Sequence, residues 1–249
     1  TSATDNYNIG IGYDAGGAVT TGTENTLVGG LAGDAINTGS NNVAVGHKAL
    51  STDDADSGNV AVGHSAMESA NGSNVQSVAV GFEALHNLSS GGACTAVGYQ
   101  AGEAISTGIG GTFIGQLAGT DITGNDNTCV GTQAGFTETS GSDNTLIGHD
   151  AGRTQNGGNG NSIVGSHAGD SITTGDNNSI LGKGAGASLT SGSNNLFLGF
   201  DAGITGSPGG NFTTGSNAIG LGNGSIASLS CQVSLTATSD ERDKTDFTN

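Results

Sequence analysis

A glycine that closes a short apolar segment recurs at nearly constant spacing along most of this chain. One copy, residues 42–50, is Asn-Val-Ala-Val-Gly-His-Lys-Ala-Leu, and eleven others follow the same pattern with drift. The twelve closing glycines are Gly12, Gly29, Gly46, Gly63, Gly81, Gly98, Gly115, Gly131, Gly148, Gly165, Gly182 and Gly199. Their spacing is 17 residues, apart from one interval of 18 and one of 16, and an alanine follows each three residues later. A fixed period of this length predicts one structural unit stacked on itself, that is, a solenoid.

The composition favours a solenoid over a globular domain. Glycine supplies 48 of the 249 residues, tryptophan is absent and aromatic residues make up 4%, which leaves few large side chains for a globular core. Disorder is the obvious alternative for so polar and glycine-rich a chain, but the apolar residues held in register argue against it. No three-residue glycine period exists, which excludes collagen. No helix is expected, because no apolar stripe has helical spacing.

The three residues that directly precede each closing glycine form the expected strand. The residues one and three before the glycine (the flanking columns) share one face, and the residue two before it (the middle column) points the other way. The residue one before the glycine is apolar in every copy, and the residue three before it is Val, Thr, Ser, Ile or Leu. The middle column is apolar too and contains Leu27, Ala44, Ala61, Ala79, Ala96, Phe113, Cys129, Leu146, Ile163, Ile180 and Phe197. A strand with one solvated face should alternate apolar and polar residues. We therefore expect one face to line the coil and the other, assigned to the middle column, to contact a second copy of the chain in a homo-oligomer.

Asparagine recurs four residues before the closing glycine, after a polar turn. The members of this Asn column are Asn8, Asn25, Asn42, Asn59, Asn127, Asn144, Asn161, Asn178 and Asn195. Stacked coils would set identical amides above one another, as between identical stacked strands. We expect a ladder of amide hydrogen bonds with a structural role.

The pattern divides the chain into three parts. Residues 1–222 form the repeat rod, about twelve repeats ending in an atypical last copy at 217–222, and 223–238 have the pattern of closing strands. Residues 239–249 change character, with acidic and basic residues close together. The sequence has neither an initiator methionine nor a signal peptide, so we expect a fragment or a processed product.

Charge and cysteine content exclude several classes of function. The formal net charge is −17, from 22 acidic and five basic residues, and such a surface repels nucleic-acid phosphates and anionic lipid. No apolar run approaches the length of a membrane span. The three cysteines, Cys94, Cys129 and Cys231, are unpatterned, so we expect buried small side chains rather than disulfides or a zinc site. No cofactor and no metal are expected; His47 and His64 lie in adjacent copies but lack a third ligand.

Two versions of the repeat resemble known families. The version at 42–50 and 59–67 resembles the head repeat of YadA-type trimeric autotransporter adhesins, and Asn-Thr-Cys-Val-Gly-Thr-Gln-Ala-Gly at 127–135 is similar to repeats of bacteriophage tail fibres. The resemblance covers roughly 6–222 and implies a homotrimer of left-handed parallel β-rolls. The family repeat is commonly shorter than the one in this chain.

The segment Ser-Asp-Glu-Arg-Asp-Lys at 239–244 resembles the start of the self-cleaving intramolecular chaperone found behind endosialidases and phage fibres. In that family the chain is cut between a serine and the following aspartate, and a lysine assists as base. Ser239, Asp240 and Lys244 match these positions, while Asp243 stands where the family usually has an apolar residue. The resemblance implies autocleavage where the full chaperone is present, by a serine hydroxyl that needs an adjacent base.

The leading hypothesis is a structural and adhesive segment of a phage tail fibre or surface adhesin. It would be a rigid trimeric rod on a virion or at an extracellular surface, and it would attach to a host cell-surface glycan or protein. The candidate receptor contacts are the large residues directly after closing glycines: Tyr13, His47, His64, Phe82, Tyr99, His149 and Phe200. The simpler interpretation is that these side chains cover a seam between subunits.

Two alternatives remain open. A ligand-binding solenoid, for calcium or ice, is suggested by a partial threonine column: Thr26, Thr95, Thr112, Thr128 and Thr145. An enzyme, such as a glycan-cleaving tailspike, would need two carboxylates about 5–10 Å apart. The acids two residues after closing glycines, Asp14, Glu83, Asp150 and Asp201, lie several copies apart, so no enzymatic activity is expected.

Overall fold

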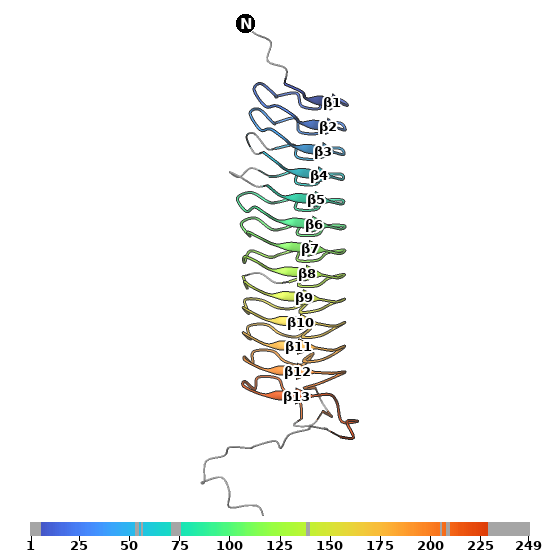
Figure 1. Ribbon diagram of the computed structural model, residues 1–249, viewed down its shortest axis with the longest axis vertical. Helices are drawn as coiled ribbons and strands as arrows, with labels where there is room; N and C mark the ends of the chain where they lie inside the picture. Colours follow the sequence, from blue (N-terminus) through green and yellow to red (C-terminus); the bar gives the residue numbers. More distant parts are fainter. Residues whose placement is uncertain are drawn as a thin grey trace, which may run out of the picture.

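The structure, a computed structural model, describes residues 6–52, 55, 57–70, 76–137, 140–204, 206–207 and 210–228. These residues contain no helix and thirteen short strands, stacked in chain order in one parallel sheet (Figure 1). The strands are β1 (Ile9–Ile11), β2 (Thr26–Val28), β3 (Val43–Val45), β4 (Val60–Val62), β5 (Val78–Val80), β6 (Thr95–Val97), β7 (Thr112–Ile114), β8 (Thr128–Val130), β9 (Thr145–Ile147), β10 (Ser162–Val164), β11 (Ser179–Leu181), β12 (Leu196–Leu198) and β13 (Ile219–Leu221). The predicted fold class, an all-β parallel solenoid built from 17-residue repeats, is confirmed.

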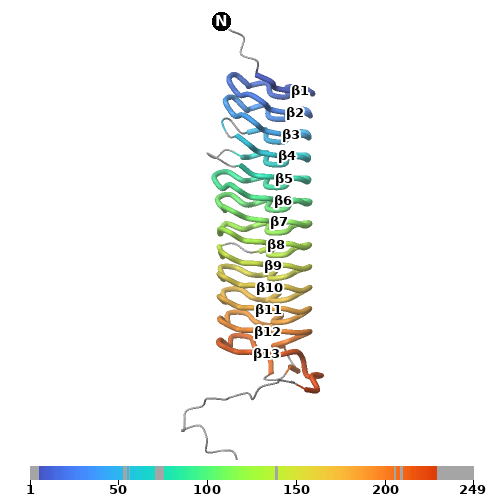
Figure 2. Tube along the Cα trace, in the orientation of Figure 1, coloured from blue at the N-terminus to red at the C-terminus, as the bar shows by residue number. Residues whose placement is uncertain are grey.

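Equivalent residues of neighbouring repeats pair directly. Val43 lies beside Val60, and Ala44 beside Ala61. The intervals of 18 and 16 residues leave this register unchanged, since β4 still pairs with β5 and β7 with β8 at equivalent positions. An extra or missing residue is therefore absorbed in the turns. Thirteen coils spaced about 4.8 Å apart make a rod on the order of 58 Å long, and Figure 2 shows this elongated shape.

The two faces of the strands are opposite to our expectation. The middle column, which we placed at a subunit interface, lies inside the coil: Ala44, Phe113 and Phe197 are at most 1% exposed. The flanking columns, one apolar throughout and the other a mixture of Val, Ile, Leu, Thr and Ser, face outward and are partly or largely exposed in β2 to β13. The physical reason is space. The interior is narrow, and several coils hold two large side chains there, such as Leu27 with Ile36, whereas the outer face accepts side chains of uniform size.

The interior volume is shared between the middle column and the fourth residue after the closing glycine. That fourth residue is glycine in most coils, and in the coil of β7 a Cβ on Gly119 would lie 2.2 Å from Cδ1 of Phe113. The coils of β3, β4 and β5 reverse the arrangement: their middle residues are alanines, and the fourth residues are Leu50, Met67 and Leu85, all buried. In these coils a small residue at one position accompanies a large one at the other.

The expected Asn ladder is present, and its side chains also bond to the backbone. Asn161 Oδ1 accepts the backbone N–H of Asn178 at 2.9 Å, and Asn161 Nδ2 donates to the carbonyl of Gly175 at 2.8 Å. Asn178 repeats both contacts one coil further along. Where the column holds Ser77, the hydroxyl accepts the N–H of Cys94 at 3.0 Å. Amides such as Asn161 and Asn178 therefore tie a strand to the next coil and to the turn, in agreement with a structural role.

The cysteine expectation is confirmed where the structure describes it. Cys94 and Cys129 are both buried, and burial raises the pKa of the Cys94 thiol. Cys231 lies outside the described residues, as do Ser239, Asp240 and Lys244 of the candidate cleavage segment. Residues 223–228 contain no strand, and the rest of the expected closing strands also lies outside. Among the described residues, no helix long and apolar enough to cross a bilayer is found.

The shared interior volume leads to a first prediction. Phe113→Ala should lower the free energy of unfolding by about 3–5 kcal/mol, because it leaves a cavity. Adding Gly119→Leu should recover part of this loss, because it recreates the alanine–leucine pairing of the β3 coil, where Leu50 already adopts a φ of 54°. Urea unfolding followed by circular dichroism measures both effects. Gly119→Leu alone should destabilise, since its Cβ would clash with Phe113; additive effects of the two changes would contradict a shared volume.

The Asn ladder gives a second prediction. Asn161→Ala should cost about 2 kcal/mol or more, because the buried N–H of Asn178 and the carbonyl of Gly175 both lose a partner. Asn161→Ser should cost less, since a hydroxyl at this position can accept the N–H of the next coil, as Ser77 does. Unfolding midpoints of the two variants and the parent test this order. Equal losses for serine and alanine would show that the acceptor contact contributes little.

Candidate functional site

The flanking columns form an apolar stripe along the outside of the rod. Ile114, Leu181 and Leu198 are 41%, 51% and 45% exposed. Their neighbours in adjacent strands are also apolar, since Val164 pairs with Leu181, and Leu181 with Leu198. A shallow concavity of about 350 Å³ lies on this side at β11–β13, between Leu196, Ile219 and several asparagines. The stripe runs along the strands of the rod and is left uncovered by the described residues.

A second outward feature is a stack of rings directly after the closing glycines. His47, His64, Phe82 and Tyr99 follow β3, β4, β5 and β6, and all four are exposed. Successive ring centroids are 5.2, 5.1 and 5.3 Å apart, with interplanar angles of 27°, 11° and 8°. We call these four residues the ring ladder. It arises because each residue stands at the same repeat position in four consecutive coils, whose strands are in register.

The other three receptor-contact candidates are also exposed but do not join the ring ladder. Tyr13 is 81% exposed and is separated from His47 by the coil of β2, where Gly30 occupies the equivalent position. Phe200 is 54% exposed and follows β12. His149 follows β9, and its ring meets His167 edge-on at a centroid distance of 5.1 Å. Of the seven candidates, the structure therefore brings four together in one surface.

A small charged cluster spans the same coils as the ring ladder. Lys48 Nζ lies 3.1 Å from Glu68 Oε1, and His86 Nδ1 lies 3.9 Å from Glu68 Oε2. Burial alone would raise the pKa of Glu68, but hydrogen bonds from Ser65 and Lys48, with the nearby positive charges, lower it overall. The cluster neutralises one of the many acids near the ring ladder.

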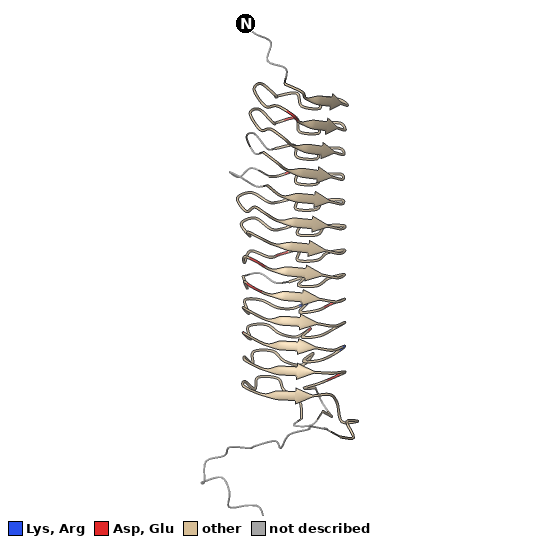
Figure 3. Cartoon of the chain, in the orientation of Figure 1, with Lys and Arg blue, Asp and Glu red and all other residues tan. Residues whose placement is uncertain are grey.

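The carboxylates proposed for a glycan-cleaving enzyme remain far apart. Asp14, Glu83, Asp150 and Asp201 follow β1, β5, β9 and β12, so at least three coil spacings separate any two of them. At about 4.8 Å per coil this exceeds 14 Å along the rod, beyond the roughly 5–10 Å that glycoside hydrolysis needs. Figure 3 shows charged residues as isolated segments along the rod. These four acids do not form a catalytic pair within one chain.

The threonine column of the ligand-binding alternative lies on the outer face. Thr95, Thr112, Thr128 and Thr145 pair in register in β6 to β9, and each is partly exposed. Val78 continues the column on one side and Ser162 on the other. The threonines thus belong to the same outward stripe as the flanking apolar residues.

One cluster was missed by the sequence reasoning. His149, Asp150 and His167 come together at the corners that follow β9 and β10. His149 was singled out only as a receptor contact and Asp150 only as a candidate catalytic carboxylate, and His167 was not singled out. Asp150 and His167 both stand two residues after a closing glycine in consecutive copies. This shared position is the signal that could have found them.

Compared with known proteins, the chain matches no family model, no curated protein and no solved structure.

Proposed function

We propose that this chain is a structural and adhesive segment of a phage tail fibre or surface adhesin. In this proposal three copies form a rigid rod, on a virion or at an extracellular surface, that attaches to a host cell-surface glycan or protein. The observation that carries it is the apolar stripe formed by the flanking columns. The resemblance of the repeats to trimeric adhesin heads and phage fibres supplies the number of chains and the adhesive role.

The apolar stripe supports assembly with further copies. It extends along strands from β2 to β13, with an apolar residue one before each closing glycine and Val, Ile, Leu, Thr or Ser three before it; a long exposed apolar surface is typical of an interaction site. Its length equals that of the rod, and the partner that matches an apolar stripe of this length and repeat is another copy of the same rod. A closed arrangement of copies would cover every stripe.

The ring ladder supports a contact with sugars. Flat aromatic faces in a row can stack on the apolar faces of glycan rings, and the backbone of a solenoid holds such rings rigidly without a further ordering cost. The ladder would either contact the receptor or cover a seam between chains. These two roles make different predictions, because only the second contributes to assembly.

Assembly gives a third prediction. Light scattering of the purified chain should give a mass near three times the 24.0 kDa of one chain. Val60→Asp with Val78→Asp should shift the mass towards one chain, because two charges would be buried at the interface. Ser89→Asp with Ser90→Asp, in an exposed turn, adds the same charge and should leave the mass unchanged. A monomeric parent would contradict the trimer and favour the ligand-binding solenoid, whose melting should then depend on calcium or whose surface should bind ice.

The ring ladder gives a fourth prediction. Phe82→Ser with Tyr99→Ser should reduce binding to a glycan array and to a panel of bacterial cells at least tenfold, without changing the mass, if the ladder contacts the receptor. Gln116→Ser with Thr132→Ser, at the same repeat position in the next two coils, is the matched control. Loss of the trimer in the ring variant would assign the ladder to a seam. Unchanged mass and unchanged binding would exclude both roles.

A further inference from the structure

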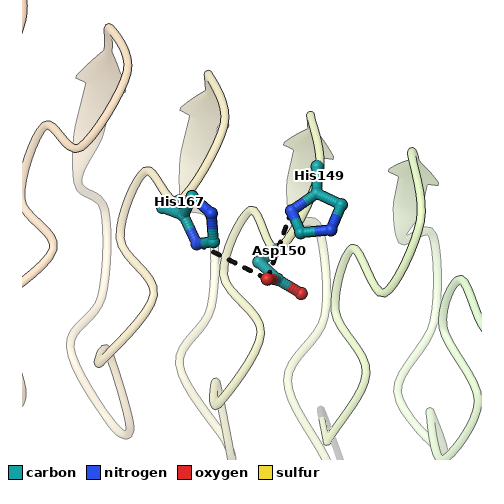
Figure 4. A group of neighbouring side chains, drawn as sticks. All are labelled: His149, Asp150 and His167. Carbon is teal, nitrogen blue, oxygen red and sulfur yellow. Dashed lines mark ion pairs between the residues drawn. The ribbon is translucent and has the colours of Figure 1, made fainter.

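We propose that His149, Asp150 and His167 bind one divalent transition-metal ion of the Zn²⁺ class. The three residues each offer a ligand atom, and these atoms lie within 4.8 Å of one another. His149 and Asp150 follow β9, and His167 follows β10 one coil further along (Figure 4). The site would therefore join two adjacent coils of the rod at their corner.

The register of the solenoid places the three side chains together. The backbone N–H of His167 donates to the carbonyl of His149 at 2.8 Å, which fixes one corner against the next. Asp150 and His167 have nearly equal φ values of 55° and 56°, as expected for the same position in consecutive coils. Their side chains therefore leave the backbone in the same direction, and His149 approaches the carboxylate from the preceding residue.

The distances are also compatible with shared ligation of one ion. Asp150 Oδ2 lies 3.2 Å from Nδ1 of His149 and 3.4 Å from Nδ1 of His167. A charge-assisted hydrogen bond would be shorter, about 2.7–2.9 Å. Ligands about 2.0–2.1 Å from a tetrahedral zinc ion are separated from one another by about 3.3–3.4 Å. The two nitrogen–oxygen separations thus already have the length of an edge of a tetrahedral site.

The carboxylate itself points to a missing partner. Asp150 is 8% exposed, and its Oδ1 is buried without a hydrogen-bond partner among the described residues. The nearest cation is Arg153, whose Nε lies 3.9 Å from this oxygen but 3.1 Å from Asp170 Oδ1, with which it pairs more closely. A buried carboxylate that is not fully satisfied is costly in free energy. A metal ion bound to Asp150 would supply the compensating charge.

The donor set selects the kind of ion. Two imidazoles and one carboxylate suit zinc, nickel, cobalt and copper, whereas calcium and magnesium take oxygen ligands. Three protein ligands leave one tetrahedral position for water. The imidazole side chains are 53% and 48% exposed, so they are free to rotate the short distance that brings both nitrogens onto one ion.

Titration of the full, tag-free chain with Zn²⁺ by calorimetry tests the site. We expect saturable binding of one ion per chain and an affinity at least tenfold lower for His149→Gln, for His167→Asn and for Asp150→Asn. Asparagine is chosen at 150 and 167 because it tolerates positive φ. Replacing Zn²⁺ with Co²⁺ should give a visible absorption typical of tetrahedral coordination in the parent and not in the double variant His149→Gln/His167→Asn.

The matched control is His47→Gln with His64→Gln. This pair also stacks between adjacent coils, with ring centroids 5.2 Å apart, but it is not part of the group of three ligands. Zinc affinity should be unchanged in this variant. No saturable binding by the parent, an unchanged affinity in His149→Gln/His167→Asn, or one ion per three chains would each overturn the proposal. If Asp150→Asn fails to fold, the variants His149→Gln and His167→Asn still test the site, because both side chains are exposed.

Discussion

Backbone contact between closing glycines in successive coils sets the geometry of the whole rod. Gly46 has a φ of 140°, and a Cβ at this position would lie 2.2 Å from the carbonyl oxygen of Gly63. The same close approach recurs at successive closing glycines from Gly12 to Gly182. The N–H of Gly46 also donates to the carbonyl of Val28 in the preceding coil at 2.8 Å. Only glycine combines this conformation with this contact, which explains why the period is so strictly kept.

The narrow coil that results from this contact controls what the interior can hold. The large buried side chains come from the middle column, as in Phe113, from the fourth residue after the closing glycine, as in Leu50, and from the seventh, as in Ile122. The Asn ladder closes the polar side of the same interior by bonding to backbone groups that water does not reach. The core is therefore a narrow column along the rod, and each coil depends on its immediate neighbours for burial, as in other repeat proteins.

The sequence predicts the period, the absence of helix, the parallel stack and the Asn ladder, because each depends on spacing alone. The sequence also indicates which face of each strand points into the coil, but the apolar pattern alone does not show this. Ala44, Ala61 and Ala79 accompany Leu50, Met67 and Leu85, whereas larger middle residues such as Phe113 accompany glycine. This exchange of volume identifies the two positions as neighbours inside the coil. Uniform Val, Ile, Leu and Thr in the flanking columns instead indicate a regular outer face.

Register also explains how an otherwise repetitive rod acquires distinct surfaces. Residues at one repeat position in adjacent coils lie about 5 Å apart, so a single substitution in each of two coils is enough to create a pair of side chains in contact. The ring ladder arises in this way from four consecutive copies, and the cluster of His149, Asp150 and His167 from two. Composition and motif spacing do not reveal such clusters, because their members are 17 residues apart or nearly so. Aligning the copies by their closing glycines reveals these clusters, because residues at the same repeat position in adjacent copies lie side by side on the rod.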